Sequence, residues 1–466
     1  MQSKFFAILM FMFSGLVFGQ DSLKLSQPEF LSIVKKYHPL AYKYRLQNKI
    51  AESEITRARA NFDPVLSGKL GEKNIDGERY YEQRNLGLEI PTWYGIELNG
   101  SYNYLDGERL SNSDTRGGLA QFGITIPLAK NLLYDKRRAL LDQAKFALKM
   151  TEAEQTVLTN DLFLDAENAY WDWVKNFEIY KIQKRSVEIN LKRLRLTKRT
   201  YELGERPAID TVEASSQLLS FQLQERDAFI NFVKSTQNLQ LYLWQDGQEF
   251  FPVAELIFPA DNLEENPGYS DYEFLAEKIR TRNLDSNASL QYYFQKENIL
   301  ESEKRLKWQS FLPKIDFSYN FFNKENYRAD YLPLFDNNFQ YGLKLEIPVF
   351  LRQARADYQI AKFKIEQNRQ DFRLKEREIK TKVETYVNEI YNYKTQIDFS
   401  TENLINYSRL LNAEEIRYNN GESSLFLINS RENKLIEAQQ KNLELRAKFL
   451  QSYNKLKWLN ENFMIR

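Results

Sequence analysis

Two regions of the chain place apolar residues at every second position. In the later region, Ile, Phe, Tyr and Leu alternate with polar residues along 315–321 and again along 339–347. In the earlier region the same alternation covers 86–90, 96–104 and 120–126, with a weaker run at 66–70. A period of two places one set of side chains on each face of a strand. We therefore expect strands within 64–127 and within 313–348.

Each strand region is followed by a long stretch with helical periodicity. Glycine and proline are both absent from 128–203 and from 349–420. Apolar residues recur there at spacings of three and four, which puts them on one narrow face of a helix. Helices of this length would run on the order of 110 Å. Shorter helices are expected at 23–62, 208–246, 272–312 and 422–462.

The same order of elements occurs twice, which predicts a duplicated helix–β-hairpin–long helix–helix unit. The first repeat spans 20–246, with strands within 64–127, a long helix at 128–203 and a tip turn at 204–207. The second spans 272–466, with strands within 313–348, a long helix at 349–420 and a tip turn at 421–424. Prolines and glycines mark 247–271 as the linker between them.

The first residues read as a secretory signal peptide. Lys4 precedes an apolar run at 5–13, and small residues follow up to Gly19, where we expect cleavage. The predicted signal peptide is therefore 1–19. The apolar run is short for a membrane-spanning helix, and the rest of the sequence holds no apolar stretch of about 18 residues.

Composition excludes several kinds of function. The 466 residues include 65 basic and 64 acidic side chains, which gives no support to nucleic-acid binding. Cysteine is absent and His38 is the single histidine, so we expect neither a metal site nor a cofactor. We expect His38, next to Pro39, to have a structural role. No spacing of carboxylates singles out a catalytic pair.

The strand runs have the length of membrane strands, which is about 9–11 residues. An ordinary half-buried soluble sheet is the alternative, and the signal peptide favours a membrane barrel. Such barrels begin at about eight strands, so one chain must close its wall with copies of itself. A homotrimer with two strands per repeat would have roughly 12 strands. The extra segment 74–117 predicts either an added hairpin in the wall, giving roughly 18 strands per trimer, or a hairpin folded above the pore.

Three short motifs, each present twice, resemble the TolC family of outer-membrane efflux proteins. The first is the turn into the strands at Pro64 and at Pro313, and the second is the strand exit at Pro127 and at Pro348. The third is the turn that ends each long helix, at 199–204 and at 417–424. The resemblance covers about 23–460. Each motif is weak alone, and their shared order on matching elements makes the resemblance specific.

The resemblance implies a mainly α protein with membrane β structure: a trimeric outer-membrane β-barrel continuous with a periplasmic α-helical barrel. It implies a homotrimer in outer-membrane lipid of a Gram-negative bacterium. Its partners would be a periplasmic adaptor (a membrane fusion protein) and an inner-membrane efflux pump or secretion transporter. The residues expected to contact the adaptor lie in the tip turns: Tyr201, Leu203, Gly204, Tyr418, Gly421, Ser423 and Ser424.

The same resemblance implies a constriction near the tips, with Asp210 and Glu213 as candidates in the first repeat and Leu427 and Ser430 in the second. Acidic residues are also favoured in the first turn of any helix, which is the simpler explanation for Asp210 and Glu213. Glycine likewise has a local role at a helix C-terminus, whatever binds there.

Passive, gated export is the function that these patterns favour. The alternative is a periplasmic coiled-coil scaffold or adaptor without a pore, which explains the helices and the signal peptide but not the alternating aromatic runs. An enzyme is a more distant alternative. The sequence does not indicate the exported substrate or the class of pump.

Overall fold

We describe the fold from a computed structural model of the chain. It describes residues 23–111, 114–245, 248–249, 257–266, 268–324 and 338–460. The predicted signal peptide, 1–19, lies outside these residues. The chain divides into two units, which we name the tip unit (Met1–Lys43, Leu158–Arg282 and Ile379–Arg466) and the sheet unit (Tyr44–Val157 and Asn283–Glu378).

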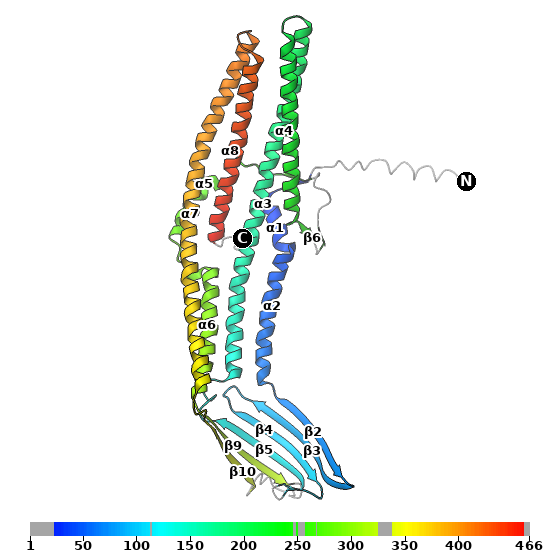
Figure 1. The fold of residues 1–466 in the computed structure, drawn as a ribbon, viewed down its shortest axis with the longest axis vertical. Coiled ribbons are helices and arrows are strands. Elements are labelled where there is room, and N and C mark those ends of the chain that lie inside the picture. Colours follow the sequence, from blue (N-terminus) through cyan, green and yellow to red (C-terminus); the bar gives the residue numbers. More distant parts are fainter. Residues whose placement is uncertain are drawn as a thin grey trace, which may run out of the picture. The chain divides into compact units, whose positions relative to one another are not determined.

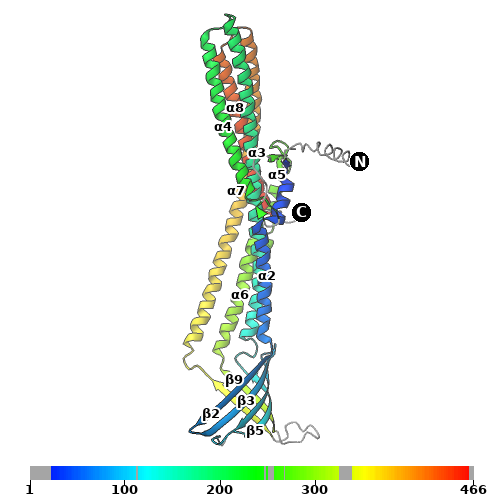
Figure 2. The ribbon, with the colours of Figure 1, turned by 90° about the vertical axis from the view of Figure 1, so that its right-hand side faces the viewer.

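The sheet unit contains one six-stranded sheet, in the order β10-β9-β5-β4-β3-β2 (Figures 1 and 2). All its neighbouring strands are antiparallel. The first repeat supplies four strands and the second supplies two. The strands are β2 (Val65–Ile75), β3 (Glu78–Pro91), β4 (Glu97–Asp106), β5 (Gly117–Pro127), β9 (Lys314–Lys324) and β10 (Phe339–Glu346). Segment 74–117, insofar as it is described, therefore adds strands to the sheet.

The two long helices have residues in both units. They are α3 (Lys136–Glu202) and α7 (Arg352–Asn419), and each is joined by a tight turn to a shorter helix, α4 (Ala208–Gln240) or α8 (Leu425–Leu459). The remaining helices are α1 (Gln27–Tyr37), α2 (Pro39–Arg59), α5 (Gly268–Arg280) and α6 (Ala288–Trp308). Single turns of 3₁₀ helix follow at Ala60–Phe62, Leu284–Ser286 and Gln309–Phe311.

Both long helices begin a few residues after the start of the stretches that lack glycine and proline. The first starts at Lys136 rather than at 128, because Asn131 has a positive φ of 71° and Asp135 Oδ1 accepts the Arg138 amide as a helix cap. The second starts at Arg352 rather than at 349, after Leu351 with a φ of 49°. The absence of glycine and proline permits a helix but does not place its first turn.

The expected single helix at 23–62 is wrong, since the range contains a strand, two α-helices and a turn of 3₁₀ helix. A strand, β1 (Leu23–Leu25), precedes α1, and the chain bends at His38 because Pro39 excludes the helical conformation there. The expected helix at 272–312 is likewise divided into α5 and α6. The predicted linker contains β8 (Ile257–Pro259), which pairs in parallel with β1. A short hairpin of β6 (Trp244–Gln245) and β7 (Gln248–Glu249) follows α4.

The core of the tip unit is aromatic. Tyr170 and Trp173 on α3 are fully buried, and the Tyr170 ring stacks on Phe30 of α1 at 5.6 Å. The Tyr170 hydroxyl donates to the Leu25 carbonyl and to Asp261 Oδ2, at 2.9 and 2.7 Å. The aromatic periodicity of the long helices is therefore a packing pattern.

One acidic side chain in this core is almost completely buried. Glu167 on α3 is 1% exposed, and its Oε1 accepts from Lys457 Nζ at 2.6 Å and from Gln27 Nε2 at 2.7 Å. Burial raises the pKa of the Glu167 carboxyl, and the Lys457 ammonium opposes that rise. The pair joins α3 to α8, so the two repeats share one core at this level.

Candidate functional site

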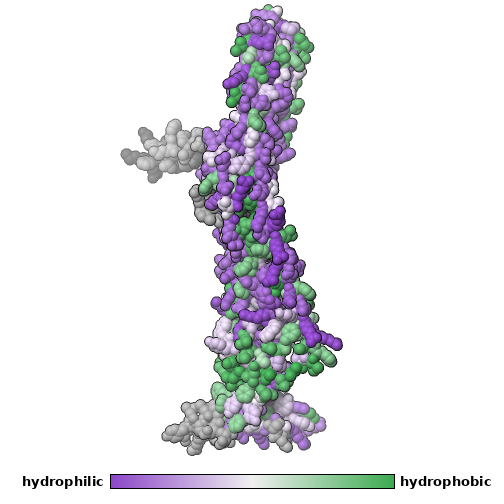
Figure 3. Space-filling view, turned by 90° about the vertical axis from the view of Figure 1, so that its left-hand side faces the viewer, coloured by the Kyte–Doolittle hydropathy of each residue, from purple (hydrophilic) through white to green (hydrophobic). Residues whose placement is uncertain are grey.

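In the half of the sheet next to the helices, the two faces differ sharply in polarity. One face carries Leu66, Leu88, Phe122, Phe321 and Phe339, which lie in one row across the strands with Gly100 between them. Of these, Phe122 is 56% and Phe339 is 54% exposed in a single chain. The hydrophobic surface over the strands is visible in Figure 3. A continuous apolar surface of this kind marks contact with lipid or protein.

The opposite face is polar, and on it a glycine lies between two asparagine side chains. Asn99, Gly123 and Asn320 lie side by side on β4, β5 and β9. A Cβ atom on Gly123 would lie 2.1 Å from Asn320 Oδ1 and 2.4 Å from Asn99 Oδ1. Glycine at this position therefore leaves room for both amides. Alternation of an apolar and a polar face is the pattern of strands that separate lipid from water.

The four predicted turn prolines lie at ends of strands. Pro64 directly precedes β2 and Pro313 directly precedes β9, whereas Pro127 is the last residue of β5 and Pro348 follows β10. The exit from β5 is held by backbone bonds from Leu128 N to the Ile315 carbonyl and from Lys130 N to the Pro313 carbonyl, at 2.7 and 3.2 Å.

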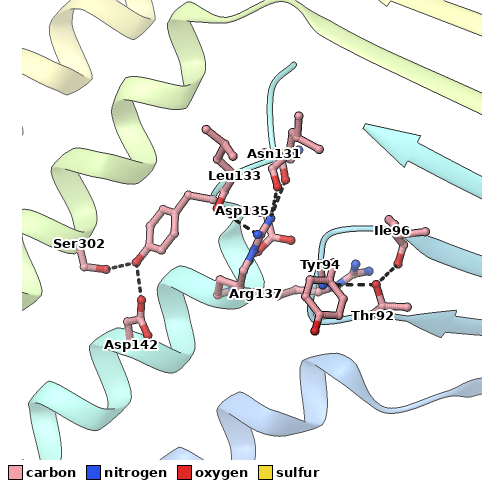
Figure 4. A network of polar contacts seen from close by, with 12 residues as sticks. Thr92, Tyr94, Ile96, Asn131, Leu133, Asp135, Arg137, Asp142 and Ser302 are labelled. Carbon is pink, nitrogen blue, oxygen red and sulfur yellow. Dashed lines mark hydrogen bonds and ion pairs between the residues drawn. The ribbon is translucent and has the colours of Figure 1, made fainter. Parts of the chain in front are cut away.

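A polar network fixes the connection from β5 to α3 (Figure 4). Arg138 donates to the carbonyls of Asn131, Leu132 and Leu133 at 2.7 to 3.0 Å, and Arg137 Nη1 donates to Glu97 Oε1 at 2.8 Å. Nearby, the Tyr134 hydroxyl contacts Asp142 and Ser302. Burial raises the pKa of the Tyr134 phenol. These bonds replace the helical hydrogen bonds that the irregular segment before α3 lacks.

The two tip turns have the same backbone geometry. Gly204 and Gly421 have φ values of 74° and 79°. In each turn the glycine amide donates three residues back, to Tyr201 or Tyr418, and the next amide donates five residues back. This is the Schellman ending of a helix, in which glycine takes the left-handed conformation. The structure thus gives both glycines the local role expected of a helix C-terminus.

The side chains of the predicted tip residues lie in different surroundings. Tyr201 and Leu203 are 46% and 66% exposed. Ser423 donates to Glu414 Oε1, and Ser424 occupies the N-cap position of α8. Tyr418 packs against a small cluster of buried residues, which are Leu194, Ala214, Leu218 and Leu425. The first turn therefore presents apolar side chains to its surroundings, and the second is partly fixed within the chain.

The four constriction candidates also separate into two kinds. Asp210 lies 4.0 Å from Arg206, and Glu213 accepts from Asn429 Nδ2 at 3.1 Å. Both acids are thus engaged with neighbours in their own chain. Leu427 and Ser430 on α8 are exposed.

Sequence reasoning singled out Tyr418 but not the partners that join the two repeats at the tips. The Arg206 guanidinium lies 4.2 Å from the centre of the Tyr418 ring, and its Nη2 donates to the Tyr418 carbonyl at 3.3 Å. Further along, the buried Glu432 on α8 pairs with Arg193 on α3 and accepts from Asn190. Arg206 lies within the predicted tip turn at 204–207, but no sequence pattern shows which partner it meets.

The described residues contain no group of three His, Cys, Asp or Glu side chains arranged to hold a metal ion. The expectation of no cofactor remains a prediction. Among the helices that the structure describes, none combines the length and apolar character needed to cross a bilayer.

Comparison with solved structures identifies the fold as that of outer-membrane channels. VceC of Vibrio cholerae superposes with a TM-score of 0.65 at 14% identity, over 93% of this chain and 95% of that chain. The open-state MtrE channel of Neisseria gonorrhoeae gives 0.66 at 12% identity, over 93% and 88%. The CmeC channel of Campylobacter jejuni gives 0.64 at 12% identity, over 93% and 84%. Identities this low establish the fold. The predicted fold class is therefore confirmed, although within one chain the sheet is open.

The sequence of the second repeat points to the same class. Residues 283–459 match the model of the family described as outer membrane efflux protein. This confirms the resemblance predicted from the paired motifs. No curated protein matches the chain. The family is one of efflux proteins rather than a class of enzymes, and together the comparisons support an outer-membrane efflux channel.

Proposed function

We propose that this protein is a passive channel through the outer membrane of a Gram-negative bacterium. Three copies would close their sheets into one barrel, and their helices would form a periplasmic tube continuous with it. Substrates would be delivered by an inner-membrane efflux pump or secretion transporter through a periplasmic adaptor that binds the tip turns. Residues 1–19 would direct export and be removed.

The observation that carries this proposal is the sheet. It has one exposed apolar face and one polar face, and among the described residues its strands β2 and β10 have a single neighbour each. In lipid, unpaired N–H and C=O groups at a sheet edge each cost several kcal/mol, so an open sheet must close with further copies. A polar inner face would then line an aqueous path.

The tip contacts suggest how the path is gated. Arg206 and Tyr418 join the α3–α4 pair to the α7–α8 pair of the same chain. Separating these helix pairs would require this contact to break. Leu427 and Ser430, which are exposed, would then face the lumen, whereas Asp210 and Glu213 would hold the helices together. We propose the first two residues as the constriction.

Purified full-length protein in detergent tests the proposal. Light scattering should give the mass of three chains, and the protein should form ion-conducting pores in planar bilayers. It should also remain with the outer membrane after a high-salt wash, whereas a periplasmic scaffold would be released. A detergent-free monomer with no conductance would overturn the proposed function.

A further inference from the structure

The two outer strands of the sheet run in opposite directions. Neighbouring strands alternate in direction throughout the sheet, and it has six strands, so β2 at one side is antiparallel to β10 at the other. In a ring of identical chains, β2 of one copy can therefore pair with β10 of the next copy as an antiparallel ladder. The alternation then continues around the ring without interruption.

The hairpin of β2 and β3, which a wall of four strands per chain would leave out, has the character of a wall element. Its Leu66, Leu70 and Leu86 are 69%, 82% and 53% exposed, and they share the apolar face of the sheet with Phe122. Lys69 and Asn85 lie opposite each other on the polar face. The register from β3 to β4 runs unbroken from Glu82 to Pro91. A hairpin folded above the pore would not continue both faces of the sheet in this way.

The stagger of the strands fixes how two copies would meet. A line of paired residues runs across the sheet from Val65, the first residue of β2, to Gln340 of β10; between them it passes Glu89, Asn99, Gly123 and Asn320. Strand β10 continues for six residues past this line, from 340 to 346, before it ends at Glu346. The ends of the strands nearest the helices thus shift by six residues across one chain.

The register that aligns the helix-proximal ends of β2 and the neighbouring β10 leaves no residue of β10 without a partner. Val65 then lies opposite Glu346 of the neighbouring copy, and the ladder continues to Glu72 opposite its Phe339. All 8 residues of β10 gain a partner. Leu66 meets the neighbouring Leu345 on the apolar face, and Ser67 meets its Lys344 on the polar face. A slip by one residue would place the apolar set against the polar set.

Resting on the proposed trimer, we propose that β2 of each chain binds β10 of the next copy in this register, and that the wall has about 18 strands. A shift of six residues over six strands makes the shear equal to the strand number. The corresponding strand tilt is roughly 36°, as in other barrels of equal shear and strand number. Because diameter grows with strand number, the pore at the sheet would be about 1.5 times as wide as that of a 12-strand wall.

Cysteine cross-linking tests the register, since the chain has no cysteine of its own. The full-length double variant Ser67→Cys/Lys344→Cys places two thiols opposite each other on the polar face. Directly opposed strand residues have Cα atoms about 4.5–5.5 Å apart, within reach of a disulfide. Mild oxidation in detergent should link the chains into dimers and trimers on a denaturing gel, and a reductant should reverse this.

Two further pairs act as controls. Ser67→Cys/Gln340→Cys keeps the same face but is displaced four residues along the strand, roughly 13 Å, and should link at least about tenfold less. Asn99→Cys/Lys344→Cys would be opposed only if β4, rather than β2, met the neighbouring copy in a wall of four strands per chain. Each single-cysteine variant should form trimers like the wild type.

The outcomes separate this inference from the proposed function. Cross-linking of the Ser67 pair supports it, whereas preferential linking of the Asn99 pair overturns the wider wall. A trimer by light scattering in which neither pair links overturns the register and leaves the channel intact. A protein that is not a trimer would overturn the proposed function first, and this inference with it.

Discussion

His38 is the one histidine of the chain, and its environment is specific. It is 7% exposed, its ring stacks on Tyr242 with centroids 5.8 Å apart, and its Nδ1 accepts the Leu40 amide at 3.2 Å. Burial lowers the pKa of the imidazole below its ordinary value of 6.5. The residue closes the bend between α1 and α2, in agreement with the structural role expected from its position before Pro39.

A pH dependence of stability follows from this lowered pKa. The unfolded chain takes up the proton near pH 6.5 and the folded chain only at lower pH, so the contribution of His38 is complete above pH 6.5 and is lost as the pH falls through the folded pKa. The thermal midpoint, followed by circular dichroism, should drop more between pH 7.5 and 5.5 in the wild type than in His38→Asn. An Asn side chain can still accept the Leu40 amide. Equal drops in both proteins would contradict the assignment.

At the scale of elements, the alternating runs form strands with one apolar and one polar face, as predicted, because successive side chains of a strand point to opposite faces. Phe122 on β5 lies on the apolar face, and its neighbour Gln121 lies on the polar face. The same alternation is compatible with a half-buried soluble sheet, and the alternation alone did not decide between a soluble sheet and a membrane barrel. The structure adds that apolar side chains on this face remain exposed within the described chain, among them Leu66, Phe122 and Leu343.

Replacing two adjacent residues by arginine tests which face meets lipid. Phe122→Arg should reduce the yield of folded protein in the outer membrane, because an arginine facing lipid costs about 2–4 kcal/mol near the middle of a bilayer. Gln121→Arg, one position along the same strand, should leave the yield near that of the wild type. Membrane fractionation and heat-dependent gel mobility measure both. Equal loss in the two variants would argue against a lipid-facing surface.

At the scale of the whole molecule, we propose that contacts between the repeats hold the channel in its resting state. Arg206 and Tyr418 come from different repeats, and their contact is at 4.2 Å. Neither the periodicity of α3 nor that of α7 predicts it, since each concerns one helix only. The resemblance predicted the tip turns themselves, but the partner of each side chain follows from how the two helix pairs pack.

Removing this contact should favour the open channel. Arg206→Ala should raise the mean conductance of single channels in planar bilayers by at least about twofold, because a cation–π contact and a hydrogen bond together contribute on the order of 1–3 kcal/mol. Lys198→Ala removes a positive charge from an exposed position of α3 near the same tip and should leave the conductance unchanged. If both variants behave like the wild type, this contact does not hold the channel closed.

The order of the long helices and of the main strand regions, and the faces of those strands, were determined by the sequence alone. Periodicity, proline and glycine are local signals, and a helix or strand reports its own period wherever it lies. The same reasoning could not place the first turns of α3 and α7, because those depend on Asn131, Leu351 and the carbonyls bound by Arg138. It also could not show that 23–62 contains a strand that pairs with β8.

Only the tertiary structure decided that the extra segment 74–117 adds strands to the sheet, that β2 and β10 are its outer strands, and that a six-residue stagger separates their ends. These features arise from pairing between segments far apart in the chain. The hydrogen bonds that fix strand order and register are between backbone groups, which every residue except proline carries alike, so side-chain pattern leaves several pairings equally possible.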